Sequence, residues 1–404
     1  MSESNINVPK LRFPGFSDAW KQRELSEVMS DFIVPMRDKP KEFSGNIPWT
    51  RIEDIEGKYL NGSLSGQYVS EETVKKMNLK IIPRGSLIVS ASATFGVVAV
   101  VTQDLITNQT FIGLVPKEDY DLDFLYTFFQ SPTVQKKMRI ESAGSTIFYI
   151  SRQTFEDMKF GMPEKAEQKK IGSFFSNLDN LITLHQRKLN HLQDEKKGLL
   201  QKMFPKNGED FPELRFPGFT HAWKQRKLAD VSAIYDGTHQ TPRYTDSGIM
   251  FLSVENIKTL KSNKYISKED FENEFKIRPE KNDVLMTRIG DVGTANVVQS
   301  DEPIAYYVSL ALFKPTQIDS NFLATSIESP FVQDGLWKRT LHIAFPKKIN
   351  KNEIENVEIN VPSIEEQKKI GELFKTLDET ITLHQRKLNH LQERKRALLQ
   401  QMFV

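Results

Sequence analysis

The chain has 404 residues, with 55 Lys and Arg against 53 Asp and Glu, 38% hydrophobic residues and no cysteine. This length suggests two or three domains, and the composition is that of a globular protein, without disulfides, thiolate zinc sites or cysteine nucleophiles. No apolar run reaches the ~18 residues of a membrane span and no secretory signal precedes the first domain, so we expect a cytoplasmic protein. The net charge of +2 is too small for a protein that binds nucleic acid by bulk charge alone.

The sequence contains two copies of one arrangement. LRFPGF at residues 11–16 and AWKQR at residues 19–23 both recur 203 residues later. Near the end of each half, EQKKIG at 167–172 and ITLHQRKLNHLQ at 182–193 recur unchanged 199 residues later. This repeat is far longer than the ~20 to 50 residues of a solenoid unit. The chain is therefore a tandem duplication of two domains with a repeated end.

The part of each half between the repeated motifs is variable and is predicted to mix strands and helices. Residues 81–102 and 282–299 are rich in Val, Ile, Ser and Thr with Gly turns, which indicates strands. Residues 122–138 and 320–336 have the composition of helices. We therefore predict an α+β fold, with most of the 27 Phe residues in its cores. Weaker matches link residues 49–55 with 251–257, and residues 85–96 with 282–293.

Each half ends in a segment predicted to form a long coiled-coil helix. Its apolar positions fall at alternating steps of four and three residues, the period of a left-handed coiled coil. In the first copy they are Ile171, Phe175, Leu178, Ile182, His185, Leu189, Leu192, Lys196, Leu199 and Met203, and the second copy repeats them from Ile370 to Met402. We expect the two helices to pair antiparallel, with the halves related by a pseudo-two-fold axis, because the second variable domain joins the helices and most domains have neighbouring ends. Ser363 and Glu366 predict a capping box at the second helix start.

Two positions of each predicted seam are polar: His185 and Lys196, with their copies His384 and Lys395. One interpretation is that they fix register and partner choice, as buried polar groups do in coiled coils. The other is that the lysines extend to solvent and the histidines lie half-exposed. A metal site at the histidines would lack a nearby carboxylate to complete it.

The sequence lacks the common catalytic motifs. There is no P-loop, no G-x-G-x-x-G, no G-x-S-x-G, no H-E-x-x-H, and no N-P-P-Y or D-P-P-Y box of amino-methyltransferases. One weak nuclease-like D…E-x-K pattern runs through Asp157, Glu167 and Lys169. Because Glu167 and Lys169 fall in the first turn of a predicted helix, where an acidic residue suits the helix dipole, we interpret them as structural. We therefore expect no catalytic residue and no metal site.

The order of variable domain, helix, variable domain and helix resembles the specificity subunit of type I restriction–modification enzymes. The likeness is carried by LRFPGF…AWKQR at the start of each half and by segments 162–172 and 361–371 at the helix starts. DGTHQTPRYTDSGIMFLSVENI at residues 236–257 adds to it. The resemblance covers essentially the full length.

This resemblance implies a division of labour. Target recognition domain 1 would cover 1–162, the first coiled-coil helix 163–204, target recognition domain 2 205–361 and the second helix 362–404. Each recognition domain would read half of a bipartite, asymmetric site in double-stranded DNA, and the coiled coil would set the gap. Two modification subunits would supply S-adenosylmethionine and adenine N6 methylation, and restriction subunits would add cleavage that depends on ATP and Mg. This chain would bind no cofactor and no membrane.

Candidate DNA contacts are polar residues at strand ends or in loops next to glycine, because Arg, Lys, Asn, Gln, Ser and Thr read base edges. In the first domain they are Arg51, Ser90, Ser92, Thr94, Ser145, Thr146 and Tyr149. In the second they are Thr238, His239, Gln240, Thr241, Arg243, Arg288, Lys347 and Lys348. The alternative for each residue is a role in a turn or a place on the solvated surface. Packing explains a lone Arg beside a strand-end Thr poorly, which favours a DNA contact for such an Arg. Candidates for partner docking are identical in both halves, as two identical partners would require: Gln186, Arg187, Asn190, Gln385, Arg386 and Asn389.

Three other functions stay open on sequence alone. A stand-alone coiled-coil DNA-binding regulator would bind DNA strongly by itself, whereas a specificity subunit would bind weakly until modification subunits are added. A nuclease or methylase would need the missing motifs. A structural coiled-coil adaptor would leave two different domains on duplicated helices unexplained.

Overall fold

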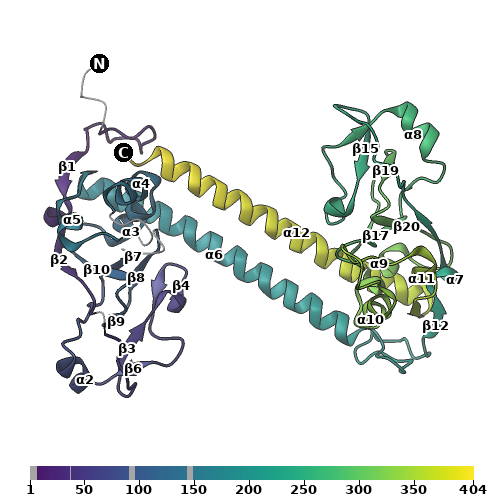
Figure 1. Ribbon diagram of the computed structural model, residues 1–404, viewed down its shortest axis with the longest axis horizontal. Helices are drawn as coiled ribbons and strands as arrows, with labels where there is room; N and C mark the ends of the chain where they lie inside the picture. The colour runs from purple at the N-terminus through teal and green to yellow at the C-terminus, as the bar shows by residue number, and fades with distance from the viewer. Residues whose placement is uncertain (1–6, 37, 91–95, 143–148) are drawn as a thin grey trace. The chain divides into compact units, whose positions relative to one another are not determined.

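The structure is a computed structural model that describes residues 7–36, 38–90, 96–142 and 149–404 (Figure 1). The chain forms two compact units, Met1–Arg187 with Gln385–Val404, and Lys188–His384. The long helices α6 (Lys165–Lys202) and α12 (Ile364–Gln401) each contribute one end to each unit.

The first unit is built on two sheets with short helices around them. The larger sheet has the order β2-β10-β7-β8-β5-β4 and the smaller one β6-β3-β9, while β1 pairs with β11. Neighbours β2, β10, β7 and β8 run antiparallel, and β5 joins β8 in parallel. The elements are β1 (Lys21–Glu24), α1 (Leu25–Val28), β2 (Met29–Ile33), β3 (Ile47–Thr50), β4 (Ile55–Glu56), β5 (Tyr59–Leu60), β6 (Tyr68–Val69), α2 (Glu71–Lys76), β7 (Leu87–Ser90), β8 (Val98–Val101), β9 (Ile106–Thr107), β10 (Phe111–Pro116), α3 (Leu122–Gln130), α4 (Pro132–Glu141), α5 (Arg152–Asp157) and β11 (Lys159–Met162).

The second unit repeats this plan with a shorter central sheet. Its sheets have the orders β13-β20-β17-β18 and β14-β16-β15-β19, and β12 pairs with β21. The parallel pair β15 and β19 corresponds to β3 and β9 of the first unit. The elements are β12 (Lys224–Lys227), α7 (Leu228–Val231), β13 (Ser232–Asp236), β14 (Tyr244–Thr245), β15 (Ile249–Leu252), β16 (Tyr265–Ile266), α8 (Lys268–Glu274), β17 (Val284–Thr287), β18 (Ala295–Val297), β19 (Ile304–Tyr306), β20 (Leu310–Pro315), α9 (Ser320–Glu328), α10 (Pro330–Arg339), α11 (Lys351–Glu355) and β21 (Glu358–Val361).

The predicted secondary structure is confirmed in type, with one correction. Residues 81–102 and 282–299 contain the antiparallel pairs β7–β8 and β17–β18. Each predicted helix over 122–138 and 320–336 is in fact two helices, α3 with α4 and α9 with α10. The break falls at a Ser-Pro pair in both, because the residue before proline is driven out of the helical conformation. In the first unit the serine, Ser131, then caps α4 by accepting a hydrogen bond from the Val134 N–H.

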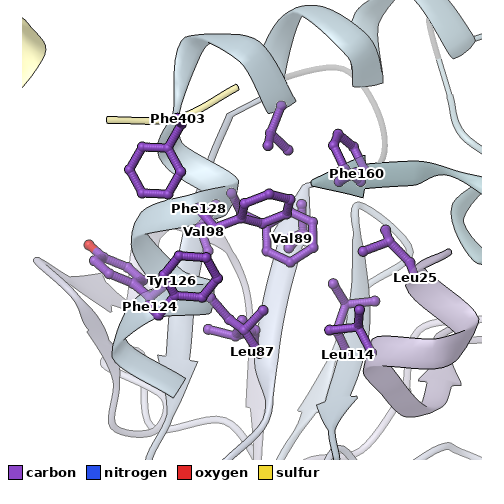
Figure 2. Packing of buried hydrophobic residues seen from close by; sticks show 14 of the residues in the cluster. Leu25, Leu87, Val89, Val98, Leu114, Phe124, Tyr126, Phe128, Phe160 and Phe403 are labelled. Carbon is purple, nitrogen blue, oxygen red and sulfur yellow. The ribbon is translucent and has the colours of Figure 1, made fainter. Parts of the chain in front are cut away.

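The core of the first unit is rich in aromatic rings, as Figure 2 shows for Phe124, Phe128 and Phe403. Phe403 comes from the C-terminal end of the chain, and its ring stacks on Phe124 with 5.9 Å between centroids. In the second unit Phe204, which follows α6, stacks on Phe322 of α9 at the same distance. Burying one such ring stabilises the fold by roughly 1.5–3 kcal/mol. The Met-Phe pair at the end of each long helix therefore completes a core begun by the other long helix.

Within each unit, the ends of α6 and α12 pack antiparallel, as predicted. In the first unit the Phe175 ring lies 6.1 Å from the Phe403 ring, and Lys395 pairs with Asp179 at 2.7 Å. Later positions on α6 therefore meet earlier positions on α12. The second unit repeats the arrangement, with 6.1 Å between the Phe204 and Phe374 rings. Of the predicted seam positions, Ile171, Phe175, Leu178, Leu189, Leu192, Met203, Ile370, Phe374, Leu388, Leu391 and Met402 are buried.

The seam lysines form ion pairs across the helices instead of extending to solvent. The Lys196 Nζ lies 2.7 Å from a carboxylate oxygen of Asp378 on α12 and 2.7 Å from one of Glu328 on α9. Burial lowers the pKa of Lys196, but the two carboxylates raise it by more, so its ammonium group stays charged. With Lys395 on Asp179, each lysine holds the two helices in one register. This favours the register-setting interpretation.

The repeated motifs join each domain to its long helix. Arg12 of the first LRFPGF donates two hydrogen bonds, at 2.8 and 2.7 Å, to the buried carboxylate of Glu167 in EQKKIG. Arg215 of the second copy donates to Glu366 at 2.7 and 2.8 Å. The Ser363 Oγ accepts from the Glu366 N–H at 3.4 Å. The capping box is only half formed, because the Glu366 carboxylate is used by Arg215. Glu167 of the D…E-x-K pattern is likewise bound by Arg12, so we interpret that pattern as structural.

The glycine of EQKKIG allows the start of a neighbouring helix to approach closely. A Cβ added to Gly172 would lie 2.5 Å from the Asp121 Oδ1 at the start of α3. A Cβ on Gly371 would lie 2.8 Å from the Asp319 Oδ1 at the start of α9. Real Cβ contacts are essentially never this short. A side chain at either position would therefore displace the helix that packs on it.

Replacing Arg215 with alanine should destabilise the second unit by about 3 kcal/mol, because the Glu366 charge would stay buried without its partner. Urea unfolding followed by tryptophan fluorescence measures the change. The matched control is Arg226→Ala in AWKQR, an exposed position where we expect a change of no more than about 0.5 kcal/mol. Equal shifts for the two variants would contradict a stabilising role of the buried pair.

Candidate nucleic-acid interface

Three segments of the second unit meet at one end of its central sheet. They are the THQT loop (residues 237–243) after β13, the segment after β17, and the LHIAF loop (residues 341–348) between α10 and α11. The Gly290 N–H donates to the Lys347 carbonyl oxygen at 2.8 Å, and the Ile349 N–H donates to the Arg288 carbonyl oxygen at 3.0 Å. Backbone hydrogen bonds thus tie the LHIAF loop to the end of β17.

Arg288 lies at the junction of these segments and is only 6% exposed. Its guanidinium group forms an ion pair with Asp236, the residue that precedes the THQT loop. Its Nε donates to the Ile349 carbonyl oxygen, directly after the LHIAF loop, at 3.1 Å. These donors are used inside the protein, so we correct the prediction that Arg288 reads a base. Its side chain is a brace between two loops.

The THQT loop is held against the end of β19. A Cβ on Gly237 would lie 2.5 Å from the Tyr307 carbonyl, so only glycine fits there. The Thr238 N–H donates to the Tyr306 carbonyl oxygen at 3.2 Å, and the Tyr306 hydroxyl donates to the Asp236 carbonyl oxygen at 2.9 Å. Burial raises the pKa of Tyr306, which keeps this hydroxyl protonated. The loop is therefore fixed at its base.

The side chains beyond this fixed base are polar and open to solvent. Thr238 is half-buried, and the exposed predicted residues are His239, Gln240, Thr241, Arg243, Lys347 and Lys348. In the part of the chain that the structure describes, no carboxylate pairs with Arg243, Lys347 or Lys348. Cations of this kind bind phosphates, and the neighbouring amide and hydroxyl groups can bond to base edges.

In the first unit the predicted residues lie in different environments. Arg51 is half-buried after β3, and its guanidinium donates to the Gln67 Oε1 at 2.5 Å. Ser90 is fully buried at the end of β7, so we correct its assignment as a DNA contact. Tyr149 is exposed. The predicted contacts Ser92, Thr94, Ser145 and Thr146 lie outside the described residues.

Arg51 lines a depression of about 210 Å³ together with Lys39, Asn108 and Gln109. Arg and Lys suit guanine, and Asn and Gln suit adenine, so the lining has the donors and acceptors of base recognition. Sequence reasoning missed all three neighbours of Arg51. The available signal was TNQT at residues 107–110, a polar run between the short strands β9 and β10.

The six candidates for partner docking are all exposed on the long helices. The Gln385 Nε2 donates to the Asn389 Oδ1 at 2.9 Å, one turn further along α12. Close to them in sequence, Leu184 and its copy Leu383 are 62% and 65% exposed, although both are large apolar residues. The repeated sequence therefore places the same polar and apolar groups at the surface of both helices.

A family model described as the type I restriction modification DNA specificity domain matches residues 17–194 and again residues 221–393. The chain belongs to this family. It is 24% identical over 387 residues to the type I restriction enzyme MjaVIII specificity subunit of Methanocaldococcus jannaschii, over 91% of this chain and 90% of that relative. It is 25% identical over 281 residues to the MjaIX specificity subunit of the same organism, over 66% of this chain and 63% of that relative.

The fold is similar to a solved member of the type I specificity family. The crystal structure of the S subunit of the type I restriction–modification system from M. genitalium matches with a TM-score of 0.70 and 14% identity, covering 98% of this chain and 99% of that one. With the two domain matches, this confirms the predicted α+β tandem fold. The family confirms the predicted role, a non-catalytic specificity subunit of a type I restriction–modification complex.

No helix among the described residues is long and apolar enough to cross a membrane. The same residues contain no group of three or more His, Cys, Asp or Glu that could hold a metal ion.

Proposed function

We propose that each half of the chain reads one half of a bipartite DNA site. The target recognition domains are residues 1–162 and 205–361, and the helices at 163–204 and 362–404 set the gap. The observation that carries this proposal is the convergence of the THQT and LHIAF loops on Arg288. The loops present cations that have no carboxylate partner among the described residues, beside amide and hydroxyl groups. The family assignment supplies the context for DNA as the ligand.

Different residues supply position and sequence information. In the second domain, Gln240, Thr241 and Arg243 read base edges, with Thr238 and His239 beside them, while Lys347 and Lys348 hold phosphates. In the first domain, Arg51 reads bases with Lys39, Asn108 and Gln109, and exposed Tyr149 adds a contact. Because these sets differ, the two half-sites have different sequences.

The gap between half-sites is set by the length of the helices. Each has 38 residues and is ~57 Å long at 1.5 Å per residue. One extra base pair moves a half-site by ~3.4 Å and turns it by ~34–36°. A spacer held in register by Lys196 and Lys395 therefore makes the gap length part of the specificity.

The chemistry belongs to other subunits of the complex. Two modification subunits dock on the helices at Gln186, Arg187 and Asn190 and at their copies Gln385, Arg386 and Asn389, and they bring S-adenosylmethionine. Restriction subunits bring ATP and Mg for cleavage. Because the net charge of this chain is only +2, the modification subunits share the binding of phosphates. The complex acts in the cytoplasm, on the DNA of the cell.

Mapping N6-methyladenine in cells tests this proposal. Cells that carry this gene and its neighbouring modification gene are compared with cells that lack only this gene. We expect a two-part motif with a fixed gap to lose methylation in the deletion. Identical methylation in both strains would contradict the proposal and favour the stand-alone regulator, which a binding assay on the isolated chain would detect.

Two alanine variants should separate base reading from phosphate binding. Gln240→Ala should relax one position of the motif at a cost of about 1–3 kcal/mol for the preferred base. Lys347→Ala should weaken binding evenly across sequences. It should also lower the slope of log affinity against log salt concentration by about the amount expected for one phosphate contact. Titrations of the purified complex with single-base variants of the site, at two salt concentrations, measure both. An equal loss of affinity for all single-base variants of the site in Gln240→Ala would contradict the assignment of Gln240 as a base reader.

A further inference from the structure

The LHIAF loop exposes large apolar side chains to an unusual degree. Ile343 is 99% exposed, and Phe345 is fully exposed. Trp337, on the preceding helix α10, is 64% exposed. Large apolar groups gathered at a surface mark a binding site, because water solvates them poorly. The composition predicts most Phe residues in the cores, and Phe345 is an exception.

This apolar tip stands on a fixed base. The Leu341 N–H donates to the Lys348 carbonyl oxygen at 2.8 Å, which closes the loop at its ends. Inside it, the Ala344 N–H donates to the Leu341 carbonyl oxygen at 3.3 Å. The His342 ring packs on Trp337 with 4.8 Å between centroids, and the His342 Nε2 lies 2.8 Å from the Trp337 carbonyl oxygen. A loop held in this way can deliver its tip without first being ordered.

The charge beside the tip points to a nucleic acid as the occupant. Lys347 and Lys348 follow Phe345 after a single proline, are exposed, and have no carboxylate partner among the described residues. Arg288 connects the base of this loop to the THQT loop. An apolar tip flanked by cations suits a duplex, whose charged backbone surrounds an apolar stack of bases. A purely apolar protein groove would leave the two lysines without partners.

We propose that Ile343 and Phe345 form a wedge that enters between two adjacent base pairs of the second half-site and opens the stack there. This inference rests on the proposed function, and it adds a way of reading DNA by deformability. Proteins that insert Phe or Ile between base steps kink the duplex and favour the steps that unstack most easily. The second half-site should therefore contain a flexible pyrimidine–purine step at the point of insertion.

Fluorescence of 2-aminopurine in the DNA tests the wedge directly. The complex of this chain with its modification subunits is bound to its mapped motif, with the probe placed at successive positions of each half-site. The methylated adenine is left out, because a base flipped for methylation gives the same signal. We expect a severalfold rise at one step of the second half-site. Ile343→Ala/Phe345→Ala should remove that rise and weaken binding at least 10-fold.

The control variant is Phe211→Ala, which removes another exposed ring from the same unit. It should keep both the fluorescence rise and the affinity. Because Ile343 and Phe345 are exposed, their double variant should unfold at the same temperature as the unchanged protein. It should also assemble with the modification subunits normally.

Three results would overturn the wedge. The first is a double variant that keeps both affinity and fluorescence. The second is a loss of affinity in the double variant without any fluorescence change, when the unchanged protein loses the same affinity for DNA with uracil in place of thymine. That result would indicate a contact with a thymine methyl group. The third is a failure of the double variant to assemble, which would make the loop a protein contact. Failure of the proposed function is a separate observation, because the unchanged complex would then bind no motif.

Discussion

Arg288→Ala should abolish recognition of the second half-site and leave recognition of the first intact. The substitution removes the ion pair to Asp236 and the hydrogen bond to the Ile349 carbonyl oxygen. The THQT and LHIAF loops then lose their shared brace, and several DNA contacts shift together. Because each lost base contact costs about 1–3 kcal/mol, losing two should weaken specific binding ~100-fold or more.

Binding and methylation of duplexes in which one half-site is scrambled measure this effect. Arg288→Lys should resemble Arg288→Ala, since a lysine cannot donate to Asp236 and Ile349 with the geometry of a guanidinium fork. The matched control is Arg339→Ala, which removes an exposed arginine paired with Glu353 in the same unit and should cost no more than about 1 kcal/mol. Unchanged motif recognition by Arg288→Ala would show that the brace is dispensable.

A structural effect alone would give a different pattern. Asp236 is 30% exposed, so losing its partner should cost only about 1–2 kcal/mol of stability after allowance for solvent screening. The variant should therefore stay folded and bind the modification subunits. A loss of assembly together with a loss of DNA binding would instead place Arg288 in the general fold.

The sequence alone was sufficient for the features that depend on period and repetition. The alternation of four and three predicted both long helices, and the linkage through the second domain predicted their antiparallel pairing. The breaks between helices at Ser131 and Ser329 could also have been predicted from the sequence, because a proline follows each serine. Composition alone does not reveal such a break, because it ignores where the proline lies.

The features that depend on contacts between distant residues were beyond the sequence. Repetition marked LRFPGF and EQKKIG, but it could not show that Arg12 binds Glu167, 155 residues away. A lone Arg288 after a strand predicts a DNA reader until its burial against Asp236, 52 residues earlier, is known. Composition predicts that most Phe residues lie in cores, and only the structure shows that Phe345 lies at the surface.

Lengthening both helices by one heptad should abolish methylation at the native gap. A second QRKLNHL placed after Leu192 and another after Leu391 would continue the seam and keep every docking candidate. Each helix would grow by ~10.5 Å, close to three base pairs of DNA. Three base pairs also turn the duplex by ~105°. A heptad adds no such rotation to the coiled coil, because it leaves the seam facing its partner. The recognition domains would therefore be both displaced and misoriented relative to the half-sites.

We expect methylation of the native motif to fall at least ~100-fold. The two recognition domains can no longer bind their half-sites at the same time, so the contacts of one domain are lost. Methylation mapping measures the loss, and circular dichroism with the mass of the complex shows that the longer helices fold and assemble. As a control, Gln193→Ala with Gln392→Ala alters the same stretch of both helices without changing its length, and should leave the motif and its rate unchanged. If the lengthened chain methylates the native motif at the normal rate, something other than the helices sets the gap. If methylation moves to a longer gap, the helices set it and the domains can rotate to follow the DNA.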